Sequence, residues 1–428
     1  MKILTAFLAL CLLAWGITVN PPEVINIWWL RNEAINLSGI LSFELMGLIM
    51  LLAVRPVWLE KSFGGLDRMY LVHKWAGILA ISFGLLHYAI KLSGGLLKQF
   101  FERPPRGARV EFWLDFLRSP VKDMAEWSIW LLGIMLVITL WQRFPYSIWR
   151  YVHKALAVIF VVLALHAVVL SPVSYWSNPL GWLIGATALI GVVCALLSLT
   201  GQIGRRRTHR ASIHSIHQIG DILELECKIK GQWQHQAGQF AFLKFNGIEG
   251  AHPFTIASAP NKENTLRVSI KALGDYTRQL PKLLNVGDAV SIEGPYGCFA
   301  MPNEAEQVWI AGGIGITPFL AWLDALKASP EQAPTATLHY CVKNEQDAVY
   351  SRKLQALCQH LPSITLHIHR SEQDGRPDMQ RLNLQAHNGI WPAIFFCGPQ
   401  GLSSSLLRDL RLAGMPKTHF HQEAFKMR

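Results

Sequence analysis

Cysteine is scarce in this chain, and its spacing argues against the common iron–sulfur and dithiol sites. The seven cysteines form no CxxC pair and no iron–sulfur spacing. None falls in a loop that we expect outside a membrane, so no external disulfide bond is expected. The sequence also lacks nucleic-acid motifs, tandem repeats and low-complexity stretches. These absences argue against an iron–sulfur protein and a nucleic-acid-binding protein.

Histidine is nearly absent from the first 204 residues. It occurs there four times, on two apolar stretches: His73 and His87 in Tyr70–Leu92, and His153 and His166 in Tyr151–Leu170. A histidine inside a bilayer is costly and usually functional, although a single one is more often a packed, hydrogen-bonded side chain. Spacings of 14 and 13 residues separate the members of each pair by about 20 Å along a helix. Four histidines so arranged are typical of axial ligands for two haems stacked across a hydrocarbon core roughly 30 Å thick.

Helical geometry suits one spacing better than the other. Fourteen residues leave His73 and His87 about 40° apart around the helix, whereas thirteen leave His153 and His166 about 140° apart. The second stretch therefore requires a bend, a π-bulge or haems approached from different sides.

Long hydrophobic runs are lacking after residue 200, where the composition is that of a soluble protein. Before it we predict six membrane-spanning helices, at Ile3–Val19, Ile35–Val54, Tyr70–Leu92, Trp127–Trp141, Tyr151–Leu170 and Pro179–Leu199. The first run has only Lys2 before it and no clear cleavage site, so we expect a retained helix rather than a signal peptide. The first 204 residues are thus predicted to form an all-α six-helix membrane bundle.

Basic residues predict the orientation of this bundle. The run GRRRTHR at 204–210 follows the last predicted span and places the soluble half in the cytoplasm. Six spans then place both the N- and C-termini in the cytoplasm, with His73 and His153 near the inner face of the cell membrane. The outer loop 92–127 conflicts with this rule because it carries six basic residues, partly balanced by five acids. The net charge of +11 partly reflects this orientation and favours contact with anionic lipid over nucleic acid.

Several residues of the membrane half allow two interpretations. Glu44 near the middle of the second span is either functional or structurally paired. Lys74 and Lys154 are placed to meet haem propionates or to reach lipid phosphate. Phe83 and Phe160 lie between the paired histidines, where a packed core aromatic is the more ordinary assignment.

After Arg210 the pattern changes to short alternating runs separated by turn residues. The runs Asp221–Ile229, Gln239–Phe245, Thr265–Ala272 and Asp288–Glu293 predict a small antiparallel β-barrel. From Gln307 onward, the runs Val308–Ala311, Ala336–Val342, Ile364–His369 and Ala393–Cys397 alternate with helical stretches. That alternation predicts an α/β domain with a parallel sheet. We place the domains at 1–204, 205–302 and 303–428.

Two motifs in the barrel region have the residue types of a flavin site. The segment HPFTIASAP (252–260) supplies Phe254 for the ring and the Thr255 hydroxyl for its polar edge. The segment GDYT (274–277) opens a helix before Pro281, and a helix N-terminus suits a pyrophosphate, although a capped helix start is as common. The segment GPYG (294–297) then closes the barrel.

A glycine-rich turn and a second short motif follow. GGIGITP (312–318) lies between a strand and a helix, where glycines let the backbone approach a dinucleotide. CGP (397–399) ends a later strand. Because ligands bind at the carboxyl ends of parallel strands, we expect both motifs to border one crevice.

Taken together, these motifs make the soluble half similar to the ferredoxin–NADP reductase superfamily. Over nearly its whole length the chain resembles the ferric reductase and NADPH oxidase family in a compact prokaryotic form. The matching marks are the four spaced histidines, the motifs above and the late segment FHQEAF (420–425). Lys91, four residues after His87, stands where the animal oxidases carry another histidine, and three residues follow Phe425, where many relatives end.

The resemblance implies bound FAD, two b-type haems and NADPH or NADH. It pairs His73 with His153 and His87 with His166 as haem ligands, and assigns catalytic roles to Thr255, Cys397 and Phe425. The remaining expected cofactor contacts are His252, Pro253, Phe254, Lys271, Gly274, Thr277, Gly312, Gly313, Gly315, Thr317, Pro318, Gly398 and Pro399.

The implied function is electron transfer across the membrane, from cytosolic NAD(P)H through FAD and two haems to oxygen or a ferric chelate outside. The resemblance indicates no obligatory protein partner. An electron-donor module for a periplasmic redox protein is the alternative, and the dinucleotide motifs argue against a transporter. Lys343 and Arg370 follow two predicted strands, where they can hold a 2′-phosphate or be ordinary surface charge; we lean towards NADPH.

Overall fold

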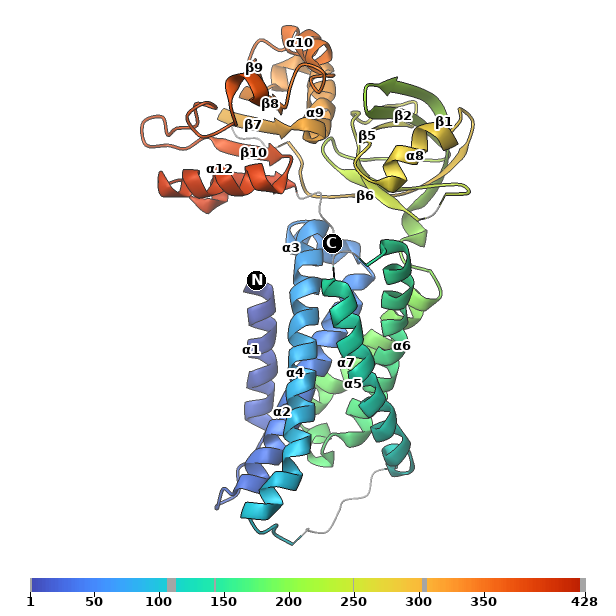
Figure 1. The fold of residues 1–428 in the computed structure, drawn as a ribbon, viewed down its shortest axis with the longest axis vertical. Coiled ribbons are helices and arrows are strands. Elements are labelled where there is room, and N and C mark those ends of the chain that lie inside the picture. Colours follow the sequence, from blue (N-terminus) through green and yellow to red (C-terminus); the bar gives the residue numbers. More distant parts are fainter. Residues whose placement is uncertain (1, 106–112, 142–143, 249, 302–305, 424–428) are drawn as a thin grey trace. The chain divides into compact units, whose positions relative to one another are not determined.

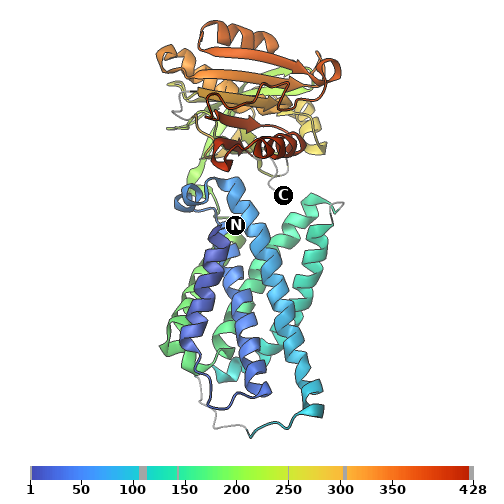
Figure 2. The same cartoon turned by 90° about the vertical axis from the view of Figure 1, so that its left-hand side faces the viewer.

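The computed structural model describes residues 2–105, 113–141, 144–248, 250–301 and 306–423. The chain divides into two compact units, one of Met1–Leu59 with Arg68–Ile203 and one of Glu60–Asp67 with Gly204–Arg428. The first unit is helical, and the second contains two β-sheets and their covering helices (Figures 1 and 2). The segment 60–67 therefore groups with the sheets, although it connects two helices of the first unit.

The first unit contains long helices at all six predicted positions. They are α1 (Lys2–Thr18), α2 (Ile27–Ala53), α4 (Leu66–Phe100), α5 (Arg118–Leu140), α6 (Tyr146–Leu170) and α7 (Pro179–Leu199), with the short α3 (Val57–Phe63) before α4. Within the described residues, five of them are long and apolar enough to cross a membrane, while α1 has 17 residues and is shorter. The prediction of membrane-crossing helices is thus confirmed for five. Helix α5 begins at Arg118, well before the predicted Trp127. The prediction began too late because charged residues such as Lys122 interrupt the apolar run without interrupting the helix.

An aromatic pair forms part of the core of the helical unit. Phe43 on α2 stacks on Phe160 on α6, with ring centroids 5.7 Å apart. Phe160 is fully buried, and it lies so close to Gly191 on α7 that a Cβ there would stand 2.2 Å from its ring. The ordinary assignment of Phe160 as a packed core residue therefore holds.

The first sheet of the second unit is six-stranded, in the order β4-β3-β6-β1-β2-β5, and each neighbouring pair is antiparallel. Its strands are β1 (Thr208–Ile219), β2 (Ile222–Ile229), β3 (Phe240–Phe245), β4 (His252–Thr255), β5 (Thr265–Lys271) and β6 (Ala289–Tyr296), with helix α8 (Asp275–Leu283) after β5. One isolated bridge, Ile256 with Val268, joins the chain just after β4 to β5. The antiparallel sheet agrees with the prediction, and its closure into a barrel stays a prediction.

Strand β1 was not predicted, although it lies inside the sheet. Its register shifts at a bulge between Ile213 and Ser215. A bulge changes the inward and outward alternation, so the apolar residues of this strand do not repeat every second position.

The second sheet is five-stranded and parallel, in the order β11-β10-β7-β8-β9. Its strands are β7 (Glu306–Gly312), β8 (Thr335–Val342), β9 (Ile364–Arg370), β10 (Ala393–Cys397) and β11 (Phe420–Glu423). Helices α9 (Thr317–Lys327) and α10 (Ser351–Gln359) cover the face that carries Trp309, and α12 (Gln400–Leu412) covers the face that carries Ile394 (Figure 1). The short α11 (Ser371–Asp374) follows β9. The α/β prediction is confirmed, with β11 as an additional strand.

Candidate functional site

The four histidines of the helical unit meet in two pairs across α4 and α6. The ring centroids of His73 and His153 lie 6.1 Å apart, and those of His87 and His166 lie 6.3 Å apart. Helix α6 is continuous from Tyr146 to Leu170, so no π-bulge accommodates its 13-residue spacing. The pairs instead meet at different interplanar angles, 52° and 80°.

The spacing of these pairs fits two ligands of one metal. Two imidazoles that bind a metal through nitrogens at about 2.0 Å have ring centroids roughly 6 Å apart. Within the described residues, no group of three or more His, Cys, Asp or Glu side chains is arranged to hold a metal ion. The pairs therefore suit a metal that brings its own equatorial ligands, as haem iron does.

A backbone carbonyl orients the His87 ring. His87 Nδ1 lies 2.9 Å from the carbonyl oxygen of Ile35 on α2. A hydrogen bond from Nδ1–H to that carbonyl leaves Nε2 as the nitrogen with a free lone pair. The Nδ1 atoms of His73, His153 and His166 are buried and make no hydrogen bond of standard geometry among the described residues.

The structure shows the surroundings of the membrane residues that allowed two interpretations. Glu44 is fully buried, and its Oε2 accepts a hydrogen bond of 2.5 Å from Thr187 on α7. This contact favours the structural pairing of Glu44. Lys74 and Lys154 are exposed in this unit, which both of their interpretations require.

The predicted flavin wall lies on β4, at one end of the antiparallel sheet. Thr255 is buried, with 7% of its surface exposed, and Phe254 is half-buried against the core of this sheet. His252 stacks on Tyr276 of α8 with ring centroids 3.7 Å apart. The strand and helix that carry the two predicted flavin motifs therefore lie together.

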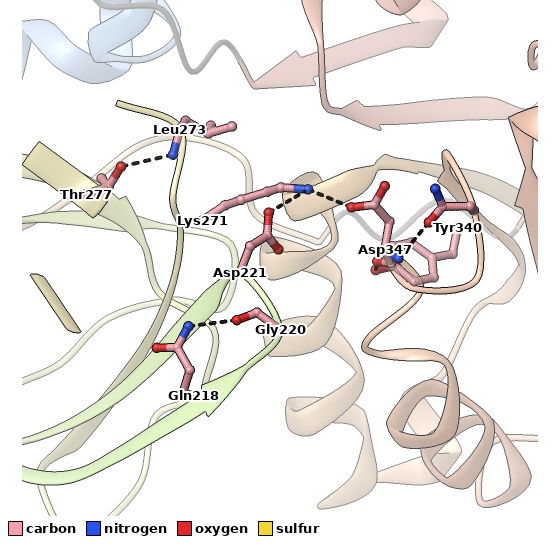
Figure 3. Close-up of polar contacts among 9 residues, drawn as sticks. Gln218, Gly220, Asp221, Lys271, Leu273, Thr277, Tyr340 and Asp347 are labelled. Atoms are coloured by element: carbon pink, nitrogen blue, oxygen red, sulfur yellow. Dashed lines mark hydrogen bonds and ion pairs between the residues drawn. The ribbon is translucent and has the colours of Figure 1, made fainter. Parts of the chain in front are cut away.

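Lys271 makes ion pairs with two carboxylates (Figure 3). Its Nζ lies 3.1 Å from Asp347, which follows β8, and 3.3 Å from Asp221, which precedes β2. Burial favours a lower pKa for Lys271, but the hydrogen bond to Asp347 and the charges of both carboxylates outweigh it and raise the pKa. Its ammonium group therefore links the two sheets. A role near flavin phosphates, expected from the sequence, stays a prediction.

Thr277 caps α8 (Figure 3). Its Oγ1 accepts a hydrogen bond of 3.0 Å from the backbone N–H of Leu273. It also accepts one of 3.1 Å from the backbone N–H of Gly274. The capped helix start weighed for the GDYT segment is therefore present. The helix also runs past Pro281 to Leu283, which the sequence did not indicate.

The glycine-rich turn and the CGP motif lie against each other. Cys397 at the end of β10 pairs with Ala311 of β7, so both strands end at the same edge of the sheet. A Cβ on Gly315 would stand 2.1 Å from the Cys397 carbonyl oxygen, and one on Gly312 would stand 2.5 Å from Pro399. Gly313 has a φ of +57°, which favours glycine. This close approach agrees with the expected shared border.

The turn leads directly into a helix. Thr317 and Pro318 are buried in the first turn of α9, where proline is favoured because its missing N–H has no helical partner. Thr317 donates its hydroxyl to the carbonyl of Ile314 at 3.1 Å. The N-terminus of α9 therefore begins immediately after the glycines.

Cys397 and Glu423 face each other on β10 and β11. Their backbones are in register, and Cys397 is fully buried. Burial, with the nearby charge of Glu423, raises the pKa of the Cys397 thiol well above its ordinary value, so the thiol stays protonated. Burial, with the charge of Asp67, raises the pKa of Glu423 to about 8.

Sequence reasoning missed Glu423. Its only sequence mark is its place two residues before Phe425, which lies outside the described residues. Of the two basic residues considered for a 2′-phosphate, Arg370 is engaged by Glu345, while Lys343 is exposed.

Three family models match consecutive parts of the chain. Residues 38–164 match the ferric reductase like transmembrane component, residues 207–300 an FAD-binding domain, and residues 309–405 the oxidoreductase NAD-binding domain. Three of the four paired histidines, at 73, 87 and 153, lie inside the first match, and His166 lies two residues beyond its end. The second contains HPFTIASAP and GDYT, and the third contains GGIGITP and CGP.

Two curated relatives each match less than half of this chain. The carnitine monooxygenase reductase subunit of Escherichia coli is 26% identical over 179 residues, which is 41% of this chain and 53% of that protein. Respiratory burst oxidase homolog protein E of Arabidopsis thaliana is 28% identical over 205 residues, 41% of this chain and 21% of that protein. The match thus spans about half of the first relative and a fifth of the second.

Among solved structures, the ferredoxin-NADP+ reductase from Plasmodium falciparum has a TM-score of 0.44 at 20% identity, covering 51% of this chain and 97% of that one. A similarity at this level assigns no function to this chain. The three consecutive family matches carry the assignment: the chain is an NAD(P)H-dependent oxidoreductase that combines a ferric reductase like transmembrane component with an FAD-binding and a NAD-binding domain, and it matches the ferric reductase and NADPH oxidase family.

Proposed function

We propose that this protein transfers electrons from cytosolic NAD(P)H through FAD and two b-type haems to an acceptor on the outer face of the membrane. The acceptor is oxygen, with superoxide as product, or a ferric chelate. The observation that carries the proposal is the pairing of four intramembrane histidines at the separation of axial ligands, in one chain with both reductase modules.

The histidines would hold the haems in two layers, His73 with His153 and His87 with His166. When bound, FAD supplies the conversion of a hydride into single electrons, and the haems supply their passage across the bilayer. Each histidine pair would supply both protein ligands of its haem iron. The acceptor would then find no vacant position on the iron, so an acceptor that takes electrons without binding iron is favoured.

Residues at the carboxyl ends of β7 and β10 would hold and orient the nucleotide. No side chain would stand between the backbone and the nucleotide phosphates at the four glycines Gly312, Gly313, Gly315 and Gly398. The N-terminus of α9 would offer its free N–H groups to these phosphates. Thr255 would donate its hydroxyl to the flavin edge, and the neutral Cys397 thiol would lie against the nicotinamide. Glu423, with its raised pKa, can hold a proton beside that thiol at neutral pH.

The finer organisation is part of the same proposal. It comprises six spans with both termini in the cytoplasm, a closed flavin barrel, and domains at 1–204, 205–302 and 303–428. Lys343 is exposed directly after β8 and supports a preference for NADPH. Phe425 would cover the flavin ring.

Two measurements on the purified protein test the proposal. The first is an absorbance spectrum of the reduced protein, in which we expect bis-histidine b-type haem bands at two haems per chain. A preparation that binds FAD but takes up no haem would reject the transmembrane path.

The second measurement identifies the acceptor. NADPH consumption is followed with oxygen alone, and then with ferric citrate under anaerobic conditions. Superoxide that dismutase removes identifies an oxidase, and activity confined to ferric citrate identifies a reductase. Activity with neither would favour a protein acceptor.

A further inference from the structure

The connection between α2 and α4 contains a buried acid. Glu60 lies in the short helix α3 and is 7% exposed. A charged side chain at this depth is costly unless it is paired and hydrogen-bonded. Glu60 lies between two membrane helices, but residues 60–67 group with the second unit. We therefore expect its charge and hydrogen-bond partners in that unit.

Two partners of Glu60 flank strands of the antiparallel sheet: Gly297 directly follows β6, and Arg207 directly precedes β1. Its Oε1 accepts a hydrogen bond of 2.6 Å from the backbone N–H of Gly297, the last residue of GPYG. Its Oε2 lies 3.9 Å from Nη1 of Arg207. Both oxygens of the carboxylate thus contact other residues of the second unit, to which Glu60 itself belongs.

Arg207 extends these contacts to two more residues of GPYG. It donates a hydrogen bond to the Pro295 carbonyl, and its guanidinium group lies 4.1 Å from the centroid of the Tyr296 ring. A guanidinium group can satisfy a carboxylate, a carbonyl and an aromatic face together because it is planar and has five donors. Glu60, Arg207 and GPYG therefore form one connected cluster, which we call the Glu60 cluster.

The same connection reaches the nucleotide side of the unit. Asp67, in the first turn of α4, contributes to the raised pKa of Glu423. From Asp67 the chain continues along α4 to His73, a rise of roughly 9 Å. The segment that the Glu60 cluster holds is therefore covalently continuous with the helix of the first histidine pair.

We propose that Glu60 is a positioning residue for electron transfer from the flavin to the first histidine pair. By binding Gly297 and Arg207, it fixes the beginning of α4 to the strand that ends in GPYG. This inference rests on the proposed function, because it concerns the step between its two cofactors. It assigns Glu60 no contact with NAD(P)H.

The test is an anaerobic stopped-flow experiment on the full-length protein with NADPH, in which flavin and haem absorbance are followed in the same reaction. In Glu60→Ala, we expect flavin reduction at the wild-type rate and haem reduction slowed about tenfold, since small misplacements of reacting groups have effects of this order or larger. Glu60→Gln keeps an acceptor for Gly297 but loses the charge facing Arg207, so it should lie between the two.

Lys61→Ala is the matched control, because Lys61 is the exposed neighbour of Glu60 on the same helix; it should behave as wild type. Arg207→Ala should reproduce the Glu60→Ala defect, and the double variant should be no slower than either single one, since the two act together. Haem content is measured in every variant.

Equal rates of haem reduction in Glu60→Ala and wild type would overturn the inference, as would a parallel loss of flavin and haem reduction. If wild-type flavin is reduced but its haems are not, the proposed function itself fails.

Discussion

Gly39 on α2 lies so close to His87 on α4 that a Cβ at position 39 would stand 2.8 Å from His87 Nδ1. That nitrogen is the one that faces the Ile35 carbonyl. The absence of a side chain at position 39 therefore allows the ring to keep its orientation.

Gly39→Ala should displace the His87 ring and selectively weaken the haem held by His87 and His166. The haem-to-protein ratio should fall from about two towards one, since overpacking forces a side chain or backbone to move. Gly95→Ala is the control, because a Cβ at that exposed position of α4 meets nothing within 4 Å. Two intact haems in Gly39→Ala would mean that this ring does not hold iron.

His153→Ala should lose one haem while flavin reduction by NADPH continues. Since its ring partner is His73, at 6.1 Å between centroids, His73→Ala should lose the same haem. The double variant should then retain as much haem as either single one, because residues that share a partner are not additive. Haem content and the reduced spectrum measure this; retention of no haem in the double variant would contradict the pairing.

Gly315→Ala should abolish tight nucleotide binding. Its Cβ would stand 2.1 Å from the Cys397 carbonyl oxygen, so β10 and the turn must separate, at a cost of about 1–3 kcal/mol. Gly401→Ala, in the nearby helix α12, meets nothing within 4 Å and should leave binding unchanged. Titration of the flavin absorbance with NADP+ gives both affinities, and equal affinities would disprove this contact.

Lys271→Ala distinguishes two roles for this lysine. If the ion pairs with Asp221 and Asp347 are its main role, Asp347→Ala should have the same small effect. The expected loss of stability is about 1 kcal/mol or less, because Asp221 is 47% exposed and solvent screens the charge. If Lys271 instead binds flavin phosphate, only Lys271→Ala should lower FAD affinity. Thermal release of FAD from each variant, followed by fluorescence, separates these results.

Glu423 should make flavin reduction depend on pH near 8. Its pKa is raised to about 8, so the carboxyl group is neutral at lower pH and becomes an anion as the pH rises through this value. An anion there opposes the negative charge that a hydride brings into the site, so the rate should fall above pH 8. In Glu423→Gln this fall should disappear. A fall that persists in the glutamine variant would assign it to another group.

The sequence was sufficient wherever a pattern is local. The two glycine-containing turns and the alternation of strands and helices follow from spacing along the chain, whereas the pairing of the α4 and α6 histidines came from the family resemblance. The turns meet because Cys397 pairs with Ala311, and that neighbourhood follows from the rule that ligands bind at the carboxyl ends of parallel strands.

Long-range partners account for what was missed. Lys271 meets Asp347 across two sheets, and Glu60 meets Gly297 across most of the chain; neither pair leaves a local pattern. Glu423 looks like an ordinary surface acid until β11 pairs with β10. Strand β1 was not predicted because its bulge breaks the alternation of apolar and polar residues on which strand prediction depends.

Strand β11 has a consequence for the order in which the protein matures. Chains are made and folded from the N-terminus onward, so α4 and α6 are synthesised and can enter the membrane long before residues 420–423 leave the ribosome. Glu423 reaches Cys397 only when β11 joins β10. The nascent protein can therefore assemble its histidine pairs while its nucleotide site is still incomplete, and it acquires the residues for accepting reducing equivalents last.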